Sequence, residues 1–257
     1  MLQQPEFSTL QFSGQSSGFR KNPAGRATFD PKYVRGLFDR IAPRYDLLNH
    51  LLSSGIDVLW RRKTIGLLCP HRPSNVLDVA TGTGDLAFEA VRQLHPHHVI
   101  GIDVAPAMLD IGRAKAVKKG FRSVEFAEGP AEALPFETDS FDALTVGFGV
   151  RNFSDLSKGL SEMYRVLRPG SPVIVLEFSR PRSFPVQQLY SLYSKTLLPA
   201  VGGFISRDRE AYEYLPGTIR EFPDGNDFLA LLRTAGFHSL KHYPLTFGIA
   251  TIYYGIK

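Results

Sequence analysis

The chain has little of what marks secreted, membrane-spanning or zinc-binding proteins. Its 257 residues include a single cysteine, Cys69, which excludes an internal disulfide bond and a cysteine zinc site. No apolar run reaches the ~20 residues that a transmembrane helix needs. Lys and Arg form no long run, the densest group being Arg61-Arg62-Lys63, so no nucleic-acid partner is expected. These absences favour a protein that is soluble or peripheral to a membrane.

The N-terminal segment lacks the apolar core of a secretory signal and is poor in acids. It is rich in Gln, Ser, Gly and Phe, with one acid, Glu6, and three bases that lie late in it. The scarcity of acids is compatible with an organelle transit peptide, but the glycines argue against an amphipathic helix. We expect residues 1–28 to form a disordered tail and residues 29–257 a single domain.

The remaining composition is that of an ordinary folded protein with a mild excess of positive charge. Hydrophobic residues make up 43% and charged residues 21%, which is enough apolar surface for a real core. The formal net charge of +5 tolerates an anionic partner such as a membrane surface.

Apolar spacing predicts helices before the first strand. Apolar residues recur on one helical face from Val34 to Ile41, and Pro43 is expected to interrupt that helix. Tyr45 and Asp46 follow this expected break. Further helical runs extend to residue 68, so residues 30–68 are predicted to form an N-terminal helical cap.

Strands and helices alternate from residue 75 onwards. This rhythm predicts an α/β fold with a doubly wound, mostly parallel sheet. A short helix over 226–235 and two closely spaced strands, with a turn at Pro244, end the chain. Such a closely joined pair must be antiparallel, because a parallel pair needs a long crossover. The other predicted strands are 75–79, 98–103, 123–127, 141–146 and 172–178, and the helices are 85–94, 106–119 and 156–167.

Residues 180–222 break this rhythm and are rich in aromatic residues and leucine. We expect them to form inserted helices on the substrate side of the fold. A face between two copies of the chain explains the same composition nearly as well, so a homodimer is an alternative.

A glycine-rich turn, "LDVATGTGD" over residues 77–85, joins a predicted strand to a predicted helix. Gly82 and Gly84, with Asp103 further on, fit a loose dinucleotide fingerprint. However, Asp78 lies where a pyrophosphate would arrive, and like charges 4 Å apart near a surface repel by about 4 kcal/mol. A phosphate-bearing ligand is therefore disfavoured.

S-adenosylmethionine suits this turn better, because it has no phosphate and is a net cation. Carboxylates beside the turn would attract it, and Asp103 at the end of the next strand would bind the ribose hydroxyls. The alternative is that Asp78 is only a strand-end acid and that Asp85 is only a helix cap.

Two sets of motifs resemble known methyltransferases. Asp78-x-x-x-Gly82-x-Gly84 with Asp103 resembles the first two motifs of Rossmann-like methyltransferases, whose final strand is antiparallel. Longer stretches resemble the C-methyltransferases of ubiquinone and menaquinone biosynthesis. The resemblance covers about residues 30–257 and implies a seven-stranded class I methyltransferase fold. The stretches "RYDLLN" (44–49) and "GFGVRN" (147–152) are far more specific than the glycine turn. The resemblance also includes "MYRVLRPG" (163–170), "LEFSRP" (176–181) and "AYEYLPGTIREFP" (211–223).

This resemblance implies S-adenosyl-L-methionine as the cofactor and a small set of contacts to it. Pro130 stands where the family usually has Asn, and Gly147 replaces a Ser found in part of the family. Both departures weaken side-chain recognition and leave main-chain contacts. The predicted cofactor site consists of Asp78, Gly82, Thr83, Gly84, Asp103, Pro130, Ala131 and Gly147.

The resemblance also implies methyl transfer to a ring carbon of a polyprenylated quinol. Such a carbon becomes nucleophilic when the neighbouring ring hydroxyl is deprotonated, so the site must favour a phenolate and align it. Arg151 is expected to stabilise the phenolate, Asn152 to orient it, and Tyr45 to close over the cofactor. The alternatives are a salt bridge for Arg151 and core packing for Tyr45. No metal is expected, because the histidine cluster at 95–98 precedes a strand, at the wrong end of the sheet.

The closing stretch "PLTFGIATIYYGIK" resembles the menaquinone branch more closely, which favours demethylmenaquinol as the substrate. The alternatives are a polyprenyl methoxy-benzoquinol, a small molecule methylated on O or N, and a binding module without turnover. Because a prenylated quinol is insoluble, we expect a bacterial cytoplasmic protein in peripheral contact with the inner face of the membrane.

Overall fold

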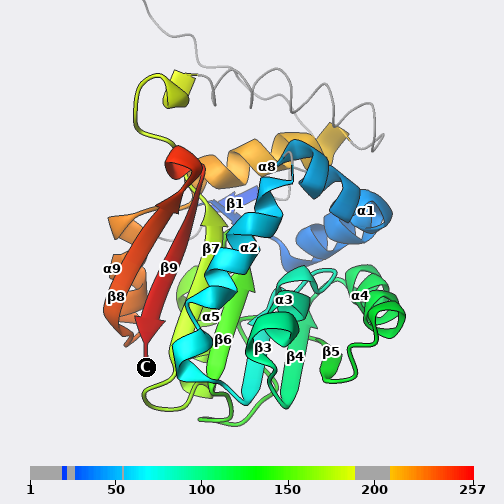
Figure 1. Ribbon diagram of the computed structural model, residues 1–257. Helices are drawn as coiled ribbons and strands as arrows, with labels where there is room; N and C mark the ends of the chain where they lie inside the picture. Colours follow the sequence, from blue (N-terminus) through cyan, green and yellow to red (C-terminus); the bar gives the residue numbers. More distant parts are fainter. Residues whose placement is uncertain (1–18, 22–26, 54, 189–208) are drawn as a thin grey trace, which may run out of the picture.

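A seven-stranded sheet forms the centre of the molecule (Figure 1). The computed structural model describes residues 19–21, 27–53, 55–188 and 209–257. The sheet has the order β5-β4-β3-β6-β7-β9-β8, in which β3 to β7 are parallel and β9 is antiparallel to β7 and β8. This arrangement confirms the predicted fold class. The strands are β3 (Asn75–Val79), β4 (His98–Asp103), β5 (Val124–Glu128), β6 (Ala143–Gly147), β7 (Pro172–Phe178), β8 (His238–Leu245) and β9 (Ala250–Ile256).

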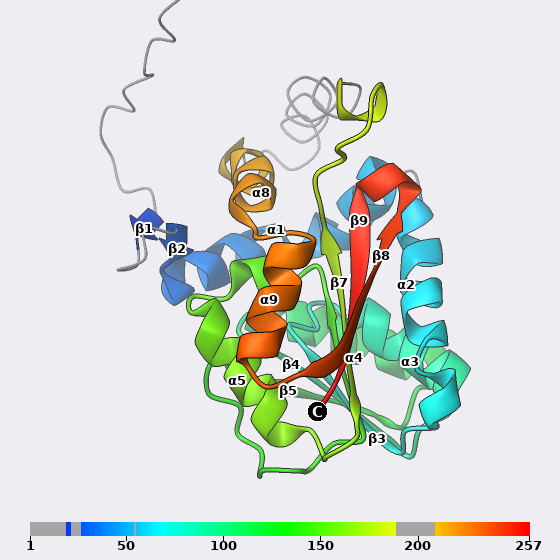
Figure 2. The same cartoon turned by 90° about the vertical axis from the view of Figure 1, so that its left-hand side faces the viewer.

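Alternate side chains of each strand enter two hydrophobic cores, one on each face of the sheet. In β7, Val173 and Val175 pack with α5 (Leu156–Val166) and α9 (Asn226–Thr234). Ile174 and Leu176 pack in the other core, which also contains residues of α2 (Ile56–Gly66), α3 (Asp85–Leu94) and α4 (Pro106–Lys119). Figure 2 shows α5 and α9 on one side of the sheet and α2 and α3 on the other. Because both faces are covered, the central strands β6 and β7 are buried and apolar along most of their length rather than alternating.

Two helices, α1 (Pro31–Leu52) and α8 (Arg209–Glu221), lie across the carboxyl ends of the parallel strands (Figures 1 and 2). The predicted interruption at Pro43 is wrong, because α1 runs through this residue. Pro43 is exposed, so water can bind the carbonyl group that its missing N–H leaves free. On the buried side, Ala42 packs against Ala105 and Met108 at the start of α4, and this contact holds the helix together.

The predicted cap, tail and insertion have a more varied structure than their composition indicated. Within residues 1–28, two short segments belong to paired antiparallel strands, β1 (Phe19–Lys21) and β2 (Ala27–Phe29). Of the predicted cap, only α1 covers the strand ends, whereas α2 packs on the sheet face against α3 and β7. The predicted insertion includes α8, and residues 189–208 of it lie outside the described residues.

The last turn of the chain also differs from its predicted position. It is formed by a short 3-10 helix, η4 (Thr246–Gly248), and not by Pro244, which lies within β8. Since β8 is an edge strand, a residue without an N–H group is tolerated there.

Candidate active site

A cavity opens at the carboxyl ends of β3 to β6, below α1. At β3 the order of strands reverses, with β4 and β5 on one side and β6 and β7 on the other. Ligands of open α/β sheets bind in the crevice at such a point. The described residues that line the cavity are Pro31, Val34, Phe38, Tyr45, Ala80, Gly82, Asp103, Val104, Met108, Gly129, Pro130, Ala131, Glu132, Gly147, Phe148, Gly149, Asn152, Phe153 and Ser154.

The turn between β3 and α3 has a backbone that favours glycine. Gly82 has a φ of 55° and Gly84 a φ of 85°, both in the left-handed region. A Cβ atom on Gly84 would also lie 2.9 Å from the Phe126 ring, so the close packing of α3 requires glycine there. Gly82 lines the cavity, whereas Gly84 lies behind the turn as the N-cap of α3.

Asp103 ends β4 and ties this turn to the neighbouring strand. Its carboxylate accepts hydrogen bonds from the N–H groups of Gly82, at 2.8 Å, and Ala105, at 3.0 Å. The side chain is partly exposed and lines the cavity. The carboxylate is therefore held in one orientation, and its remaining lone pairs are available to the hydroxyl groups of a ligand.

Asp78 lies beneath the turn and not in the cavity. It is 1% exposed, and its two oxygens accept hydrogen bonds from the hydroxyl groups of Thr81, at 2.6 Å, and Thr145, at 2.5 Å. Burial raises the pKa of Asp78 to about 6, although both hydroxyl groups oppose the shift. The structure thus makes Asp78 a support of the turn, without the cofactor contact that the sequence predicted.

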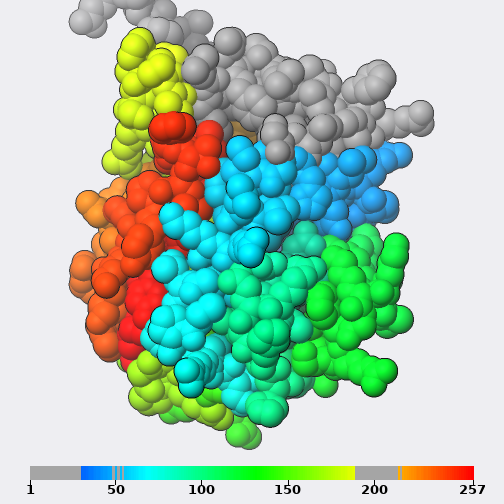
Figure 3. Space-filling model, in the orientation of Figure 1, coloured from blue at the N-terminus to red at the C-terminus, as the bar shows by residue number. Residues whose placement is uncertain are grey.

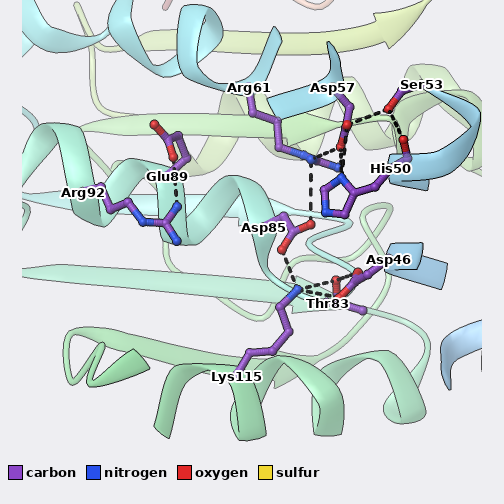
Figure 4. A network of polar contacts seen from close by, with 10 residues as sticks. All are labelled: Asp46, His50, Ser53, Asp57, Arg61, Thr83, Asp85, Glu89, Arg92 and Lys115. Carbon is purple, nitrogen blue, oxygen red and sulfur yellow. Dashed lines mark hydrogen bonds and ion pairs between the residues drawn. The ribbon is translucent and has the colours of Figure 1, made fainter. Parts of the chain in front are cut away.

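Thr83 and Asp85 belong to a network of charged side chains (Figure 4). Thr83 is 2% exposed, and its hydroxyl group donates to Asp46 at 2.6 Å. Asp85 accepts a hydrogen bond from the Lys115 ammonium at 2.5 Å and lies 3.8 Å from the Arg61 guanidinium. Burial would raise the pKa of Asp85, but these two cations hold it below its usual value. The second carboxylate beside the glycine turn is therefore paired within the protein.

The floor of the cavity carries only negative charge. Asp103 and Glu132 are the acids among the described lining residues, and these include no Lys or Arg. A pyrophosphate would meet two carboxylates and no cation, whereas a net cation would be attracted. Pro130 and Ala131 lie on the same side as Glu132, and Gly147 contributes from the end of β6.

Helix α1 supplies an apolar wall through Pro31, Val34, Phe38 and Tyr45. The rings of Phe38 and Tyr45 are 6.0 Å apart in an edge-to-face arrangement. Tyr45 also reaches the glycine turn, since its Cε1 atom lies 3.9 Å from the position of a Cβ on Gly82. The tyrosine thus covers the turn from the side opposite the sheet.

The turn after β6 forms the remaining wall, and it separates two adjacent predicted residues. The 3-10 helix η2 (Val150–Asn152) places Asn152 in the cavity, where its Oδ1 accepts a hydrogen bond from the Tyr214 hydroxyl at 2.9 Å. The side chain of Arg151 is 5% exposed and pairs with Glu177, which is 0% exposed, at 2.6 Å. The Arg151 Nε atom is buried without a hydrogen-bond partner among the described residues.

The sequence profile of the ubiE/COQ5 methyltransferase family matches residues 26–257. The chain belongs to this family. It is 47% identical over 225 residues to a demethylmenaquinone methyltransferase of Bacteroides fragilis, covering 87% of this chain and 92% of that protein. It is 45% identical over 240 residues to a ubiquinone/menaquinone biosynthesis C-methyltransferase, UbiE, of Geobacter sulfurreducens, covering 93% of each.

A solved structure shows the same fold in a more distant protein. It is an S-adenosylmethionine-dependent methyltransferase of Thermotoga maritima, with a TM-score of 0.61 and 21% identity, covering 86% of this chain and 99% of that one. Membership of the family confirms the predicted enzyme class, a methyltransferase that depends on S-adenosyl-L-methionine.

In this ubiE/COQ5 methyltransferase, the cavity brings together only part of the predicted site. Asp78, Thr83, Gly84 and Arg151 lie behind its walls. The predicted residues that line it are Tyr45, Gly82, Asp103, Pro130, Ala131, Gly147 and Asn152.

Sequence reasoning missed the partners that fix these residues. Glu177 is the one acid within the apolar stretch 172–178, and this isolation is a signal that could have marked it as buried and paired. No comparable signal exists for Tyr214, whose partner Asn152 is 62 residues away in the sequence. Lys115 lies on the predicted helix 106–119 among other polar residues, and nothing in this pattern distinguishes it from an ordinary surface lysine.

Proposed function

We propose that this methyltransferase transfers the methyl group of S-adenosylmethionine to a ring carbon of demethylmenaquinol, a step of menaquinone biosynthesis. The observation that carries the proposal is a single cavity that joins a cation-free acidic floor to an aromatic wall. The floor suits a cationic cofactor, and the wall suits a quinol ring with its prenyl chain. The name of the Bacteroides fragilis relative supports the choice of quinol.

The floor fits S-adenosylmethionine, which supplies an electrophilic methyl group on a sulfonium. Asp103 is held by Gly82 and Ala105 with lone pairs to spare, and we assign it the ribose hydroxyls. Gly82 and Gly147 let the ligand approach the main chain. The backbone of Pro130 and Ala131 is assigned to the adenine.

Titration calorimetry tests the cofactor assignment. We expect S-adenosylmethionine to bind with micromolar affinity and NAD not to bind. Binding of NAD, or a failure to bind S-adenosylmethionine, would overturn this interpretation of the glycine turn.

The substrate side has the groups that a phenolate requires. Because the Oδ1 atom of Asn152 accepts from Tyr214, its NH₂ group is left to donate to the ring oxygen. We retain Arg151 for phenolate stabilisation as part of the proposal: its side chain lies behind the cavity wall, but its Nε–H has no partner among the described residues, and use of this donor requires the η2 turn to move toward the bound ring. Glu177 neutralises much of the charge of Arg151, so the guanidinium acts mainly as a directed donor. A guanidinium keeps its proton in proteins and so cannot act as the base, and the ring proton passes to water.

Tyr45 completes the arrangement by closing over the turn that carries the cofactor. Its ring lies against Phe38 and above Gly82, where it can hold the quinol ring in line with the methyl group. Correct alignment of the reacting atoms lowers the barrier without any further chemical group.

The benzoquinol of ubiquinone biosynthesis is the second candidate substrate, since the Geobacter sulfurreducens relative is named for both pathways. Parallel assays with short-chain demethylmenaquinol and a methoxy-benzoquinol separate the two. We expect faster methylation of the naphthoquinol, and turnover of the benzoquinol alone would assign the enzyme to the other pathway.

Capture of a prenylated quinol from the cytoplasmic face of a bacterial membrane is part of the proposal. No helix in the described residues is long and apolar enough to cross a membrane. On one face of the molecule, η4 lies beside the start of α2 (Figure 3). The Trp60 indole of α2 donates a 2.8 Å hydrogen bond to the Thr246 hydroxyl of η4. Two large apolar side chains are exposed here, Leu59 (62%) and Phe247 (76%). The exposed cations Arg62 and Lys63 follow on α2 and suit an anionic surface.

Co-sedimentation with vesicles tests this contact. Binding to anionic vesicles should exceed binding to neutral ones, fall with added salt, and decrease in Leu59→Ser and Phe247→Ser. Equal recovery of all three proteins without vesicle binding would contradict it. If the two substitutions instead abolish a dimer seen by sedimentation velocity, the surface around Leu59 and Phe247 is a contact between two copies of the chain.

A further inference from the structure

The charged network of Figure 4 connects the helix that covers the cavity to the turn that forms its floor. We propose that Asp46, Thr83 and Lys115, named here the latch, hold α1 down over the cofactor and so determine how long it remains bound. The inference rests on the proposed binding of S-adenosylmethionine. It makes Asp46 and Lys115 positioning residues, since neither lines the cavity.

The latch joins three separate elements through one carboxylate and one ammonium group. Asp46 of α1 accepts from the Thr83 hydroxyl at 2.6 Å and from the Lys115 ammonium at 2.9 Å. Lys115 of α4 also donates to Thr83, at 3.1 Å, and to Asp85 at the start of α3, at 2.5 Å. All three N–H groups of the ammonium are thus directed at acceptors. α1, the glycine turn and α4 meet at this point.

The latch is shielded enough for its charges to matter. The side chains of Lys115 and Asp46 are 18% and 33% exposed, and Thr83 is 2% exposed. Ion pairs on an open surface contribute little, whereas charge-assisted hydrogen bonds away from bulk water are stronger. Lys115 also separates Asp46 from Asp85, so its removal would leave two carboxylates facing each other.

The latch acts on the cavity through the residue next to Asp46. Tyr45 lines the cavity with its ring over Gly82, while Asp46 points to Thr83 (Figure 4). A ligand seated on Gly82 and Asp103 therefore lies under Tyr45. Movement of this part of α1 away from the turn opens a way out for the ligand and breaks the latch bonds.

Other attachments of α1 lie on both sides of the latch. Towards the C-terminus of the helix, His50 lies 2.9 Å from the Asp57 carboxylate of α2, and two contacts nearer the N-terminus would remain in place if the latch opened. Asp39 accepts a hydrogen bond from the Ala107 N–H at 3.1 Å, and Arg35 pairs with Glu128 at 2.8 Å. The Arg35 pair is about half exposed and does not touch the glycine turn, with side-chain exposures of 47% and 49%. It offers a matched control, because its loss removes an ion pair from the same helix without touching the latch.

The test compares Asp46→Asn and Lys115→Met with two controls. One is Arg35→Gln, and the other is Arg92→Gln, which removes the ion pair between Arg92 and Glu89 within α3 (2.9 Å) and touches no latch residue. Calorimetry and stopped-flow dissociation are measured with S-adenosylmethionine, and melting temperatures with the free proteins. We expect both latch variants to bind S-adenosylmethionine about tenfold more weakly, a loss that corresponds to one charge-assisted hydrogen bond. The weaker binding should result from faster dissociation of the cofactor. The single-turnover rate at saturating cofactor should stay within about twofold of wild type. Lys115→Arg should restore part of the affinity, and the controls should match wild type.

A double-mutant cycle decides how Thr83 acts. Under the latch, Thr83→Val weakens binding only through Asp46, so adding Thr83→Val to Asp46→Asn has little further effect. If the Thr83 hydroxyl bound the cofactor itself, Thr83→Val would weaken binding by its full amount in the Asp46→Asn background as well, and the two effects would add. Additive effects of Thr83→Val and Asp46→Asn would contradict the latch. This cycle can be measured even if Lys115→Met does not fold.

The outcomes for the latch and for the proposed function are distinct. If the wild type fails to bind S-adenosylmethionine, the proposed function is wrong. If the wild type binds and both Asp46→Asn and Lys115→Met bind and release the cofactor at the wild-type rate, the latch is wrong and the proposed function stands.

Discussion

The floor and the cover of the cavity are assembled in opposite ways. Most of the floor comes from one part of the chain, from β3 through the segment after β5, with Gly147 added from the end of β6. Its central bond joins Gly82 to Asp103, 21 residues apart. The cover comes from α1, η2 and α8, and its bond between Asn152 and Tyr214 joins residues 62 apart. On the proposed assignments, the cofactor contacts thus come mainly from residues that are close in the sequence, whereas the substrate contacts depend on the completed fold.

The two halves also hold their charges differently. On the cover side, Arg151 and Glu177 form a single pair with side chains 5% and 0% exposed. On the floor side, Asp103 keeps part of its surface open to the cavity. Substitution of the Arg151–Glu177 pair should therefore alter the chemical rate and the stability, and substitution of Asp103 should alter cofactor affinity.

Arg151→Ala is expected to have the largest effect. Loss of a donor to a developing oxyanion costs about 10²–10³ in kcat, while cofactor affinity should be nearly unchanged. Removal of one partner of a buried pair should also lower the free energy of unfolding by about 3–5 kcal/mol, because Glu177 is left unpaired. Single-turnover methylation of a short-chain quinol is measured beside a melting curve.

Two further variants separate these effects of Arg151. Arg151→Gln combined with Glu177→Gln removes the pair without a stranded charge, so stability should recover while the rate stays low. Arg151→Lys should recover only part of the rate, because a point charge lacks the planar fork. If Arg151 is only a structural salt bridge, each variant will retain the wild-type rate per folded molecule.

Asp78→Asn tests the support beneath the floor by changing the pH dependence of stability. The pKa of Asp78 is raised to about 6 by burial, so the folded protein binds a proton between pH 4 and 6 that the unfolded chain has lost. Wild-type stability should therefore fall as the pH rises through this window. The variant should be more stable above it, by up to about 3 kcal/mol, and the gain should vanish near pH 4. Urea unfolding at several pH values measures this gain, and a gain that is constant with pH would rule out titration of Asp78.

Asp103→Ala tests the floor where it faces the ligand. It removes charge-assisted hydrogen bonds worth about 1.5–3 kcal/mol, which corresponds to a loss of about 10–100-fold in affinity for S-adenosylmethionine. The rate at saturating cofactor should change far less. If that rate falls while the affinity for S-adenosylmethionine is unchanged, Asp103 acts on the substrate, and the assignment of the floor to the cofactor is wrong.

Tyr214→Phe should have the smallest effect on kcat of these variants, because it changes one hydrogen bond in the cover of the cavity. It removes the hydrogen bond to Asn152 but keeps the ring that packs on α1, so kcat should fall by about fivefold. Burial raises the pKa of Tyr214, which therefore remains a protonated donor over the usual assay range. Tyr164→Phe, in α5 against Phe237, is the matched control. If both variants have the wild-type kcat, Tyr214 does not orient Asn152.

The same contrast explains how much could be predicted from the sequence. The bounds of α3 and α4 match the predicted 85–94 and 106–119, because glycine and proline mark their starts and the apolar pattern is local. Gly82 and Asp103 lie where the strand–turn–helix pattern placed them. For these residues, a strand end and its neighbouring turn are enough to define the site.

The remaining features required knowledge of contacts distant in the sequence. Pro43 did not end α1, because packing of Ala42 on α4 outweighs the local cost of proline. Arg151 and Asn152 are adjacent in η2, shortly after the end of β6, yet only Asn152 enters the cavity. The direction of Arg151 is determined by Glu177 on the neighbouring strand, which no spacing within the motif reveals.

The most direct test of the central claim is mass spectrometry of the product formed from short-chain demethylmenaquinol and S-adenosylmethionine with an isotopically labelled methyl group. The proposed function predicts a product with a single labelled methyl group on a ring carbon, formed only when the protein is present. No product despite cofactor binding, or a label carried on oxygen, would contradict it.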